Sequence, residues 1–208
     1  MYVARILYPV RVLGPGDRIG IWFDGCPHHC NGCSNPELWE FKDEYKTNIQ
    51  TVMNLIYSVA DRNNIDGFTL TGGDPFYQPE ALEMLLNEIY GISSDILCYT
   101  GFDYEQIKAN YKEILGKVAV LIDGRYIEQQ NNGSILRGSD NQRVIILKEE
   151  QKDRYDEYMR NASNEVQNFK THNSMISVGI HKRDYNDNIK DFASRNGFVE
   201  VLQEKGGE

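Results

Sequence analysis

Long hydrophobic runs are absent from this sequence of 208 residues, and so is any excess of positive charge. No apolar segment approaches the roughly 20 residues that a membrane-spanning helix needs, and Met1 to Arg5 do not begin a signal-peptide pattern. The formal net charge is −9, which argues against nucleic acid as the main partner. We therefore expect a cytoplasmic protein that acts on neither a membrane nor a nucleic acid.

Cysteine is also scarce, and its few copies are unevenly placed. Three of the four cysteines lie close together, unlike the evenly spread framework of a secreted disulfide protein. Cys26, Cys30 and Cys33 form a C-x3-C-x2-C spacing, which can hold three corners of a cubane iron–sulfur cluster. Cys98 is distant and lies in a hydrophobic run, where we expect a buried thiol. A cluster held by three thiolates keeps one iron open to another ligand.

Apolar runs and amphipathic segments alternate along most of the chain. Residues 51–60, 79–90 and 103–115 have the spacing or the boundary residues of helices. The short continuous apolar runs beside them are typical of strands buried on both faces. This order predicts an α/β fold in which a parallel sheet is covered by helices and curls into a partial (β/α) barrel. The expected strands are residues 19–23, 67–71, 96–99, 118–122 and 143–147.

Four chemically distinctive segments each follow one of these expected strands. The cysteine loop comes first, then residues 72–75 (Gly-Gly-Asp-Pro), 99–101 (Tyr-Thr-Gly) and 123–125 (Asp-Gly-Arg). Parallel α/β sheets bind their ligands at the carboxyl ends of the strands. We therefore expect all four segments to converge on one rim and to form a single site.

In these residues the sequence resembles the radical S-adenosylmethionine (SAM) superfamily, and within it the activating enzymes of anaerobic ribonucleotide reductase. The resemblance covers roughly residues 1–148. It is carried by the cysteine loop within residues 25–39 and by residues 71–75, 99–101, 123–126 and 136–143. It implies the partial barrel of radical SAM enzymes and a 4Fe–4S cluster held by Cys26, Cys30 and Cys33. It also implies that the open iron binds SAM, whose expected contacts are Gly72, Gly73, Asp74, Pro75, Tyr99 and Thr100.

The resemblance further implies an activity. One electron from the reduced cluster would cleave SAM and yield a 5′-deoxyadenosyl radical, which takes a hydrogen from a glycine of a large partner enzyme. That partner is expected to be anaerobic ribonucleotide reductase, and the electron donor a protein such as flavodoxin or ferredoxin. No catalytic residue beyond the cluster ligands is assigned.

Three other interpretations stay open from the residues. His28 or His29 could complete a zinc site with the cysteines. The chain could be a radical SAM enzyme that modifies a peptide or a small molecule. It could also be a non-catalytic binding module that uses a structural metal.

Residues 149–208 extend beyond the compact activase-like core of residues 1–148. Residues 149–158 indicate a charged, solvated helix. A strand at 175–180, a short helix at 187–194 and a strand at 197–202 predict a β-α-β-like extension packed on the core, ending in a frayed terminus. Packing of residues 175–180 over the barrel mouth would favour a small-molecule or peptide substrate. Extension of the sheet edge, with an open mouth, would favour a protein substrate.

Overall fold

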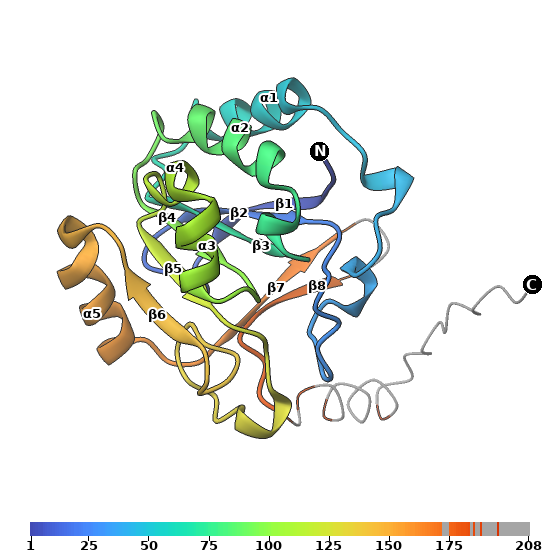
Figure 1. The fold of residues 1–208 in the computed structure, drawn as a ribbon, viewed down its shortest axis with the longest axis vertical. Helices are drawn as coiled ribbons and strands as arrows, with labels where there is room; N and C mark the ends of the chain where they lie inside the picture. The colour runs from blue at the N-terminus through green and yellow to red at the C-terminus, as the bar shows by residue number, and fades with distance from the viewer. Residues whose placement is uncertain (172–174, 184, 186–187, 189–194, 196–208) are drawn as a thin grey trace, which may run out of the picture.

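The computed structural model describes residues 1–171, 175–183, 185, 188 and 195. Six strands form one sheet in the order β1-β2-β3-β4-β5-β6, so neighbours in the sheet are also neighbours in the sequence (Figure 1). The four central strands run parallel, as the sequence predicts, which confirms the mixed α/β class. The strands are β1 (Val3–Val10), β2 (Arg18–Phe23), β3 (Gly67–Gly72), β4 (Ile96–Tyr99), β5 (Val120–Asp123) and β6 (Arg143–Ile146).

The two outer strands show that the expectation of an entirely parallel sheet was wrong. β6 runs antiparallel to β5, because the 124–142 connection contains no α-helix and the chain turns back beside the strand it has just left. β1, which the sequence analysis did not assign, pairs antiparallel with β2. Its side chains are mostly half-buried and it contains Pro9, as edge strands can. Closure of the sheet into a partial barrel stays a prediction.

Helices α1 (Ile49–Ala60) and α2 (Pro79–Ile89) lie where the sequence predicts them. α1 begins at a capping residue, Asn48, whose side-chain oxygen accepts a hydrogen bond from the Thr51 N–H. The single helix expected at 103–115 is instead two short ones, α3 (Tyr104–Asn110) and α4 (Lys112–Leu115). Tyr111 between them has φ −134° and ψ 45°, which is not helical. No helix among the described residues combines the length and apolar composition needed to cross a bilayer.

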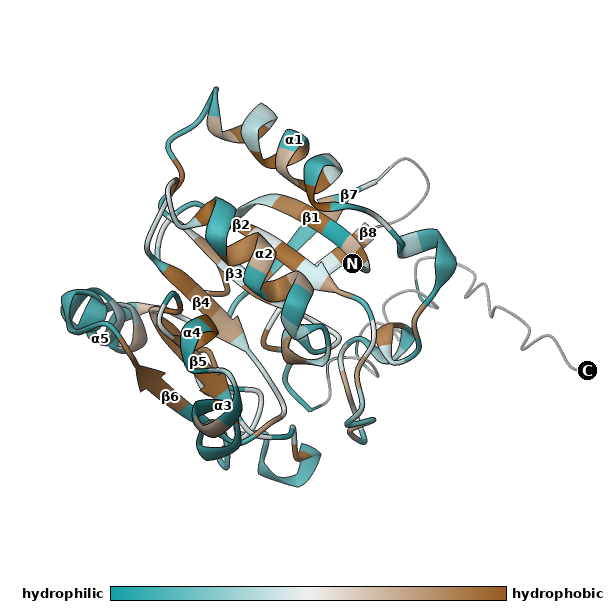
Figure 2. Cartoon of the chain, turned by 45° about the horizontal axis from the view of Figure 1, so that its top comes forward, coloured by the Kyte–Doolittle hydropathy of each residue, from teal (hydrophilic) through white to brown (hydrophobic). Residues whose placement is uncertain are grey.

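Helices α1 to α4 cover one face of the sheet, where their apolar side chains form the largest part of the core (Figures 1 and 2). Alternate residues of the strands face the other side, because side-chain direction alternates along a strand. In β2, for example, Ile21 packs under the helices while Trp22 packs on the opposite face. That opposite face is covered by the C-terminal third of the chain.

The C-terminal third supplies α5 (Lys152–Asn161) and a separate antiparallel pair, β7 (Val166–Lys170) and β8 (Met175–Gly179). The charged helix and the strand near residue 175 are thus confirmed, whereas β7 was not predicted. The other two expected elements, at 187–194 and 197–202, lie outside the described residues apart from Asn188. The division into a core of residues 1–148 and an extension of residues 149–208 stays a prediction.

A buried ion pair holds α5 against the amino-terminal ends of the strands. The Arg18 guanidinium, at the start of β2, lies 2.9 Å from Asp95, and both side chains are almost fully buried. Tyr155 of α5 donates a hydrogen bond of 2.6 Å to the same carboxylate. This end of the sheet is therefore closed by polar contacts, which leaves the carboxyl ends as the place for a ligand.

Candidate functional site

A cavity of about 190 Å³ opens where the parallel strands end. Its lining includes Cys26, Cys30 and Cys33, residues 72–74, residues 99–101 and Gly124. These belong to the four segments that the sequence analysis placed on one rim, so the structure brings them together. Pro75 is the one expected cofactor contact that does not line the cavity. It is buried at the start of the turn after β3.

The three clustered cysteines are free thiols, half-buried on the loop that follows β2. The Cys33 N–H donates to the Cys30 carbonyl at 3.2 Å, and the Asn35 N–H lies 3.4 Å from the Cys33 Sγ. Burial raises the pKa of Cys26 to about 11 and also raises that of Cys33, so each keeps its proton until a metal replaces it. Three sulfur donors on one cavity wall, with a backbone N–H near one sulfur, fit an iron–sulfur cluster.

The neighbouring histidines have partners of their own. His28 contacts Asp74, and His29 stacks on Trp39 with 4.9 Å between ring centres. No three His, Cys, Asp or Glu side chains of the described residues are placed to hold one metal ion. In a cubane cluster each thiolate binds a different iron, so such ligands need not meet at one point.

Gly72 and Gly73 allow the end of β3 to lie directly against the start of the cysteine loop. The Gly73 N–H donates to the Phe23 carbonyl, and the Asp74 N–H donates to the Gly25 carbonyl, each at 2.8 Å. A Cβ at Gly72 would lie 2.4 Å from the Phe23 carbonyl oxygen, and one at Gly73 would lie 2.3 Å from that of Gly25. No side chain fits at either glycine. The pair therefore fixes the cysteine loop relative to the sheet.

Asp74 connects three segments of the rim through its buried carboxylate. One oxygen accepts hydrogen bonds from the Phe76 N–H at 2.9 Å and from the Thr100 hydroxyl at 3.0 Å. The other accepts from the Gly101 N–H at 2.8 Å and lies 2.9 Å from the His28 Nε2. The carboxylate thus joins the cysteine loop, β3 and the end of β4. A cofactor contact at Asp74 is expected from the sequence, but its hydrogen bonds to three segments are not.

The residues of the Asp-Gly-Arg segment after β5 have two different roles: Asp123 is part of the buried framework, and Arg125 lies at the rim. Asp123 is buried, accepts a hydrogen bond from the Tyr104 N–H at 2.8 Å, and pairs with Arg143. Arg125 donates to the His28 carbonyl at 2.6 Å, which ties this segment to the cysteine loop. Gln142 lines the cavity and donates to the Gly124 carbonyl at 2.8 Å. Neither arginine of residues 136–143 lines the cavity: Arg143 pairs with Asp123, and Arg137 donates to the carbonyls of Asp140 and Gln142.

A family model described as "4Fe-4S single cluster domain" matches residues 12–145, which include every segment just described. The chain belongs to that 4Fe–4S family. Membership supports an iron–sulfur cofactor and agrees with the three thiols on the cavity wall.

Several named proteins are similar in sequence to this chain. The anaerobic ribonucleoside-triphosphate reductase-activating protein of Enterobacteria phage T4 is 38% identical over 144 residues, 66% of this chain and 90% of that protein. Proteins of the same name from Haemophilus influenzae and Escherichia coli K12 are 33% and 30% identical, each over 68% of this chain and 96% of their own length. These matches confirm the resemblance to glycyl-radical activases of the radical SAM superfamily.

About a third of this chain lies outside those alignments, and the 4Fe–4S family model ends at residue 145. Beyond that point the structure adds residues 177–181, at and after the end of β8, to the cavity wall. The strand is expected from the sequence, which left open whether it packs over the barrel mouth or extends the sheet edge; residues 177–181 line the cavity. Tyr126 and Gln142 were also not singled out as cavity residues, although both lie in segments that carry the resemblance.

Proposed function

We propose that this protein activates an anaerobic ribonucleoside-triphosphate reductase by radical SAM chemistry. Cys26, Cys30 and Cys33 would hold a 4Fe–4S cluster, and SAM would bind in the cavity beside it. When bound and reduced, the cluster would supply the one electron needed to cleave SAM to methionine and a 5′-deoxyadenosyl radical, and hydrogen transfer from a glycine of the reductase would then leave 5′-deoxyadenosine and a glycyl radical.

The observation that carries the proposal is the presence of the three thiols and the Gly-Gly-Asp turn on the wall of one cavity. Each thiol is free; Gly25, next to Cys26, accepts a hydrogen bond from the Asp74 N–H after β3, and the Cys33 N–H donates to the Cys30 carbonyl. The names of the relatives support the choice of reductase as the partner. The electron donor, the cytoplasmic location and the absence of a nucleic-acid partner stay predictions.

The residues of the chain position the reactants. Gly72 and Gly73 hold β3 against the cysteine loop, so the cofactor contacts expected there would lie next to the thiolates. Asp74 keeps Thr100 and Gly101 on the same wall. Half-buried thiols in a lined cavity also limit the access of water and oxygen to the cluster.

The chemistry is tested by anaerobic reconstitution with iron and sulfide, followed by reductant and SAM. The expected products are methionine and 5′-deoxyadenosine in equal amounts, measured by chromatography. The Cys30→Ala variant should form neither product. SAM cleavage that persists in this variant would contradict the three-cysteine ligand set.

A second candidate function has one observation in its favour. β7 and β8 form their own sheet rather than extending the edge of the main sheet, and residues 177–181 line the cavity. A wall of that kind suits a peptide or small-molecule substrate on the same scaffold. The two candidates share SAM cleavage and differ in whether the reductase acquires a radical.

A further inference from the structure

The segment after β8 contains a histidine at the cavity wall that the 4Fe–4S family model does not cover. His181 lines the cavity, yet its Nε2 atom is buried without a hydrogen-bond partner among the described residues. Burial lowers the pKa of His181, so the imidazole is neutral at neutral pH and offers one donor and one acceptor. A buried polar atom without a partner is costly, and it indicates a group that a ligand can satisfy.

The position of His181 is fixed from several sides. Its carbonyl accepts a hydrogen bond from the Asn131 side chain at 2.8 Å. Its ring stacks on Tyr185, with 4.0 Å between ring centres and 10° between ring planes, and the Tyr185 hydroxyl is hydrogen-bonded to Ser177 of β8. Arg183 donates to the Gln129 carbonyl at 2.6 Å. The residues around the histidine thus bind the connection between β5 and β6, which belongs to the part matched by the family model.

The β7–β8 pair is itself anchored to the sheet face that carries the cavity. The Gln167 side chain accepts a hydrogen bond from the Arg11 N–H at 3.0 Å and donates to the Pro9 carbonyl at 2.7 Å. Val178 packs in one apolar cluster with Leu13 and Trp22. The pair is therefore firmly attached to the sheet, and its strand β8 forms part of the cavity wall.

The cavity wall on the side of His181 is largely apolar. Leu13, Trp22, Val178 and Ile180 line this cavity, and Ser177 is a further polar residue of β8 in the lining. An isolated polar group in a largely apolar surface matches a flat, uncharged heterocycle with polar edges.

The charged residues of the cavity lining further restrict the chemical class of the ligand. The described lining residues include no lysine or arginine, so nothing there would balance a phosphate. Their one carboxylate, Asp74, already receives its hydrogen bonds from the protein. If SAM binds with its methionine end at the cysteine loop, the remaining part is a nucleoside without phosphate. An adenosyl group has a flat ring and neutral polar edges, which suit this wall.

We propose that His181 forms a hydrogen bond with the adenosyl group of SAM, and that the β7–β8 pair is thus a cofactor-binding wall added to the family core. The inference rests on the proposed function. It concerns binding, so it is tested without turnover.

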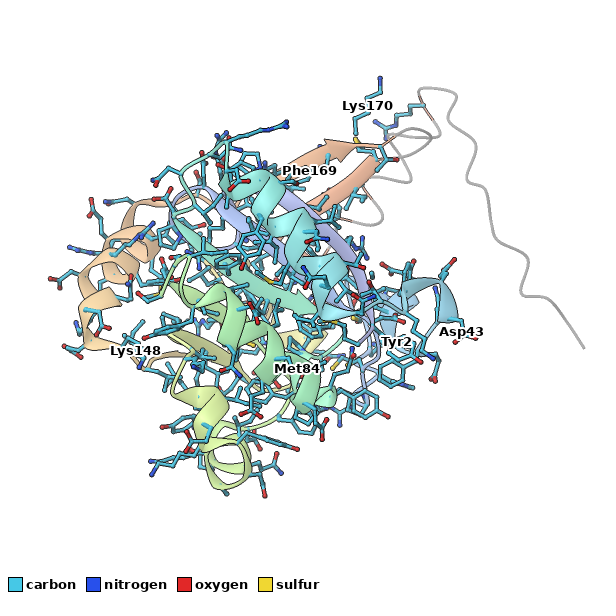
Figure 3. All side chains as sticks on the ribbon, turned by 90° about the horizontal axis from the view of Figure 1, so that it is seen from above. Tyr2, Asp43, Met84, Lys148, Phe169 and Lys170 are labelled. Carbon is cyan, nitrogen blue, oxygen red and sulfur yellow. The ribbon has the colours of Figure 1, made fainter. Side chains whose placement is uncertain are left out.

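The test is calorimetric titration of the full-length, anaerobically reconstituted protein with SAM, 5′-deoxyadenosine and methionine. His181→Phe keeps a ring that can stack on Tyr185 and removes both nitrogens. It should weaken the binding of SAM and of 5′-deoxyadenosine by about tenfold and leave methionine binding unchanged. His181→Gln, which keeps a donor and an acceptor, should recover most of the affinity. Lys170→Ala, on the same pair but exposed and extended away from the body (Figure 3), serves as the control.

The outcomes separate this inference from the proposed function. SAM binding in His181→Phe within twofold of the wild-type value would overturn the inference alone. An equal loss for SAM and methionine would also overturn it, because it would show a general distortion of the site. Wild-type protein that carries its cluster but binds no adenosyl ligand would overturn the proposed function as well. Iron content, measured in every variant, shows whether the cluster is loaded.

Discussion

The Nε2 of His28 lies 2.9 Å from a carboxylate oxygen of Asp74, which joins the cysteine loop to the turn after β3. Both side chains are largely shielded from solvent, and His28 also meets Phe102 edge-on at 4.5 Å between ring centres. One contact thus connects the loop that is expected to hold the cluster to the turn that is expected to bind SAM. A substitution at either residue should therefore affect both the cysteine loop and the turn after β3.

The first prediction concerns Asp74. Asp74→Asn should lower the free energy of unfolding by about 1–3 kcal/mol, because an amide nitrogen replaces one of two oxygens that accept buried hydrogen bonds. It should also weaken SAM binding, with no loss of iron. Urea unfolding, calorimetry and an iron assay measure the three effects. Asp43→Asn, at an exposed site, is the control. Unchanged stability and unchanged SAM affinity would show that Asp74 does not organise the site.

A second prediction separates the clustered cysteines from the isolated one. Cys30→Ala should abolish cluster loading while leaving the fold intact, because Cys30 is only half-buried on a loop. Cys98→Ala should load a full cluster but lose about 1 kcal/mol of stability, since it removes a fully buried sulfur from the core. Iron and sulfide analysis and thermal unfolding distinguish the two. A cluster that loads fully in Cys30→Ala would refute the ligand assignment.

The raised pKa of Cys26 leads to a third prediction, for the protein without iron. Only the thiolate is alkylated, and burial raises the pKa of this thiol to about 11, so little thiolate exists at neutral pH. Alkylation of Cys26 should therefore be slow at pH 7 and should accelerate as the pH rises towards 11. Mass spectrometry of iodoacetamide-treated protein measures the modification. Cys98 is fully buried, and burial also raises its pKa well above the ordinary value, so it should stay unmodified while the protein is folded. Rapid alkylation of Cys26 at pH 7 would contradict the buried environment.

The fourth prediction concerns the ion pair at the other end of the sheet. Asp95→Ala should destabilise the protein by about 3–5 kcal/mol, because it leaves the Arg18 guanidinium buried without its partner. Tyr155→Phe should cost about 1 kcal/mol, since it removes one hydrogen bond and keeps the ring in the core. Neither change should alter iron content, because the pair lies at the amino-terminal ends of the strands. Equal small losses for both variants, measured by urea unfolding, would argue against a buried charge pair.

Local patterns in the sequence were enough to predict the central part of the fold. Continuous apolar runs located β2 to β5, helical spacing located α1, and the boundary residues Pro79 and Gly91 located α2 within a few residues. The directions of the outer strands, β1 and β6, were harder to predict, because each depends on how the connecting segment leads the chain back to the sheet. Only the absence of a helix in the connection between β5 and β6 makes that pair antiparallel. The break at Tyr111 likewise follows from local backbone geometry that spacing alone does not reveal.

The parts of the candidate site that could be predicted are those in which a chemically distinctive motif directly follows a strand. The cysteine spacing and the Gly-Gly-Asp turn each follow a strand, so their meeting on one rim could be inferred. The contact between His28 and Asp74 depends on side-chain geometry, and 45 residues separate the two in the chain. The role of His181 depends on how a separate strand pair packs across the sheet, which no pattern within that segment records.

Low-temperature electron paramagnetic resonance can detect whether this protein places a radical on a reductase, as proposed. The reconstituted, reduced protein is mixed anaerobically with SAM and the anaerobic ribonucleotide reductase of the same host. A new organic doublet on the reductase, absent with Cys30→Ala, is the predicted result. A cluster signal and SAM cleavage without any doublet on the reductase would contradict the claim and would direct attention to the peptide or small-molecule alternative.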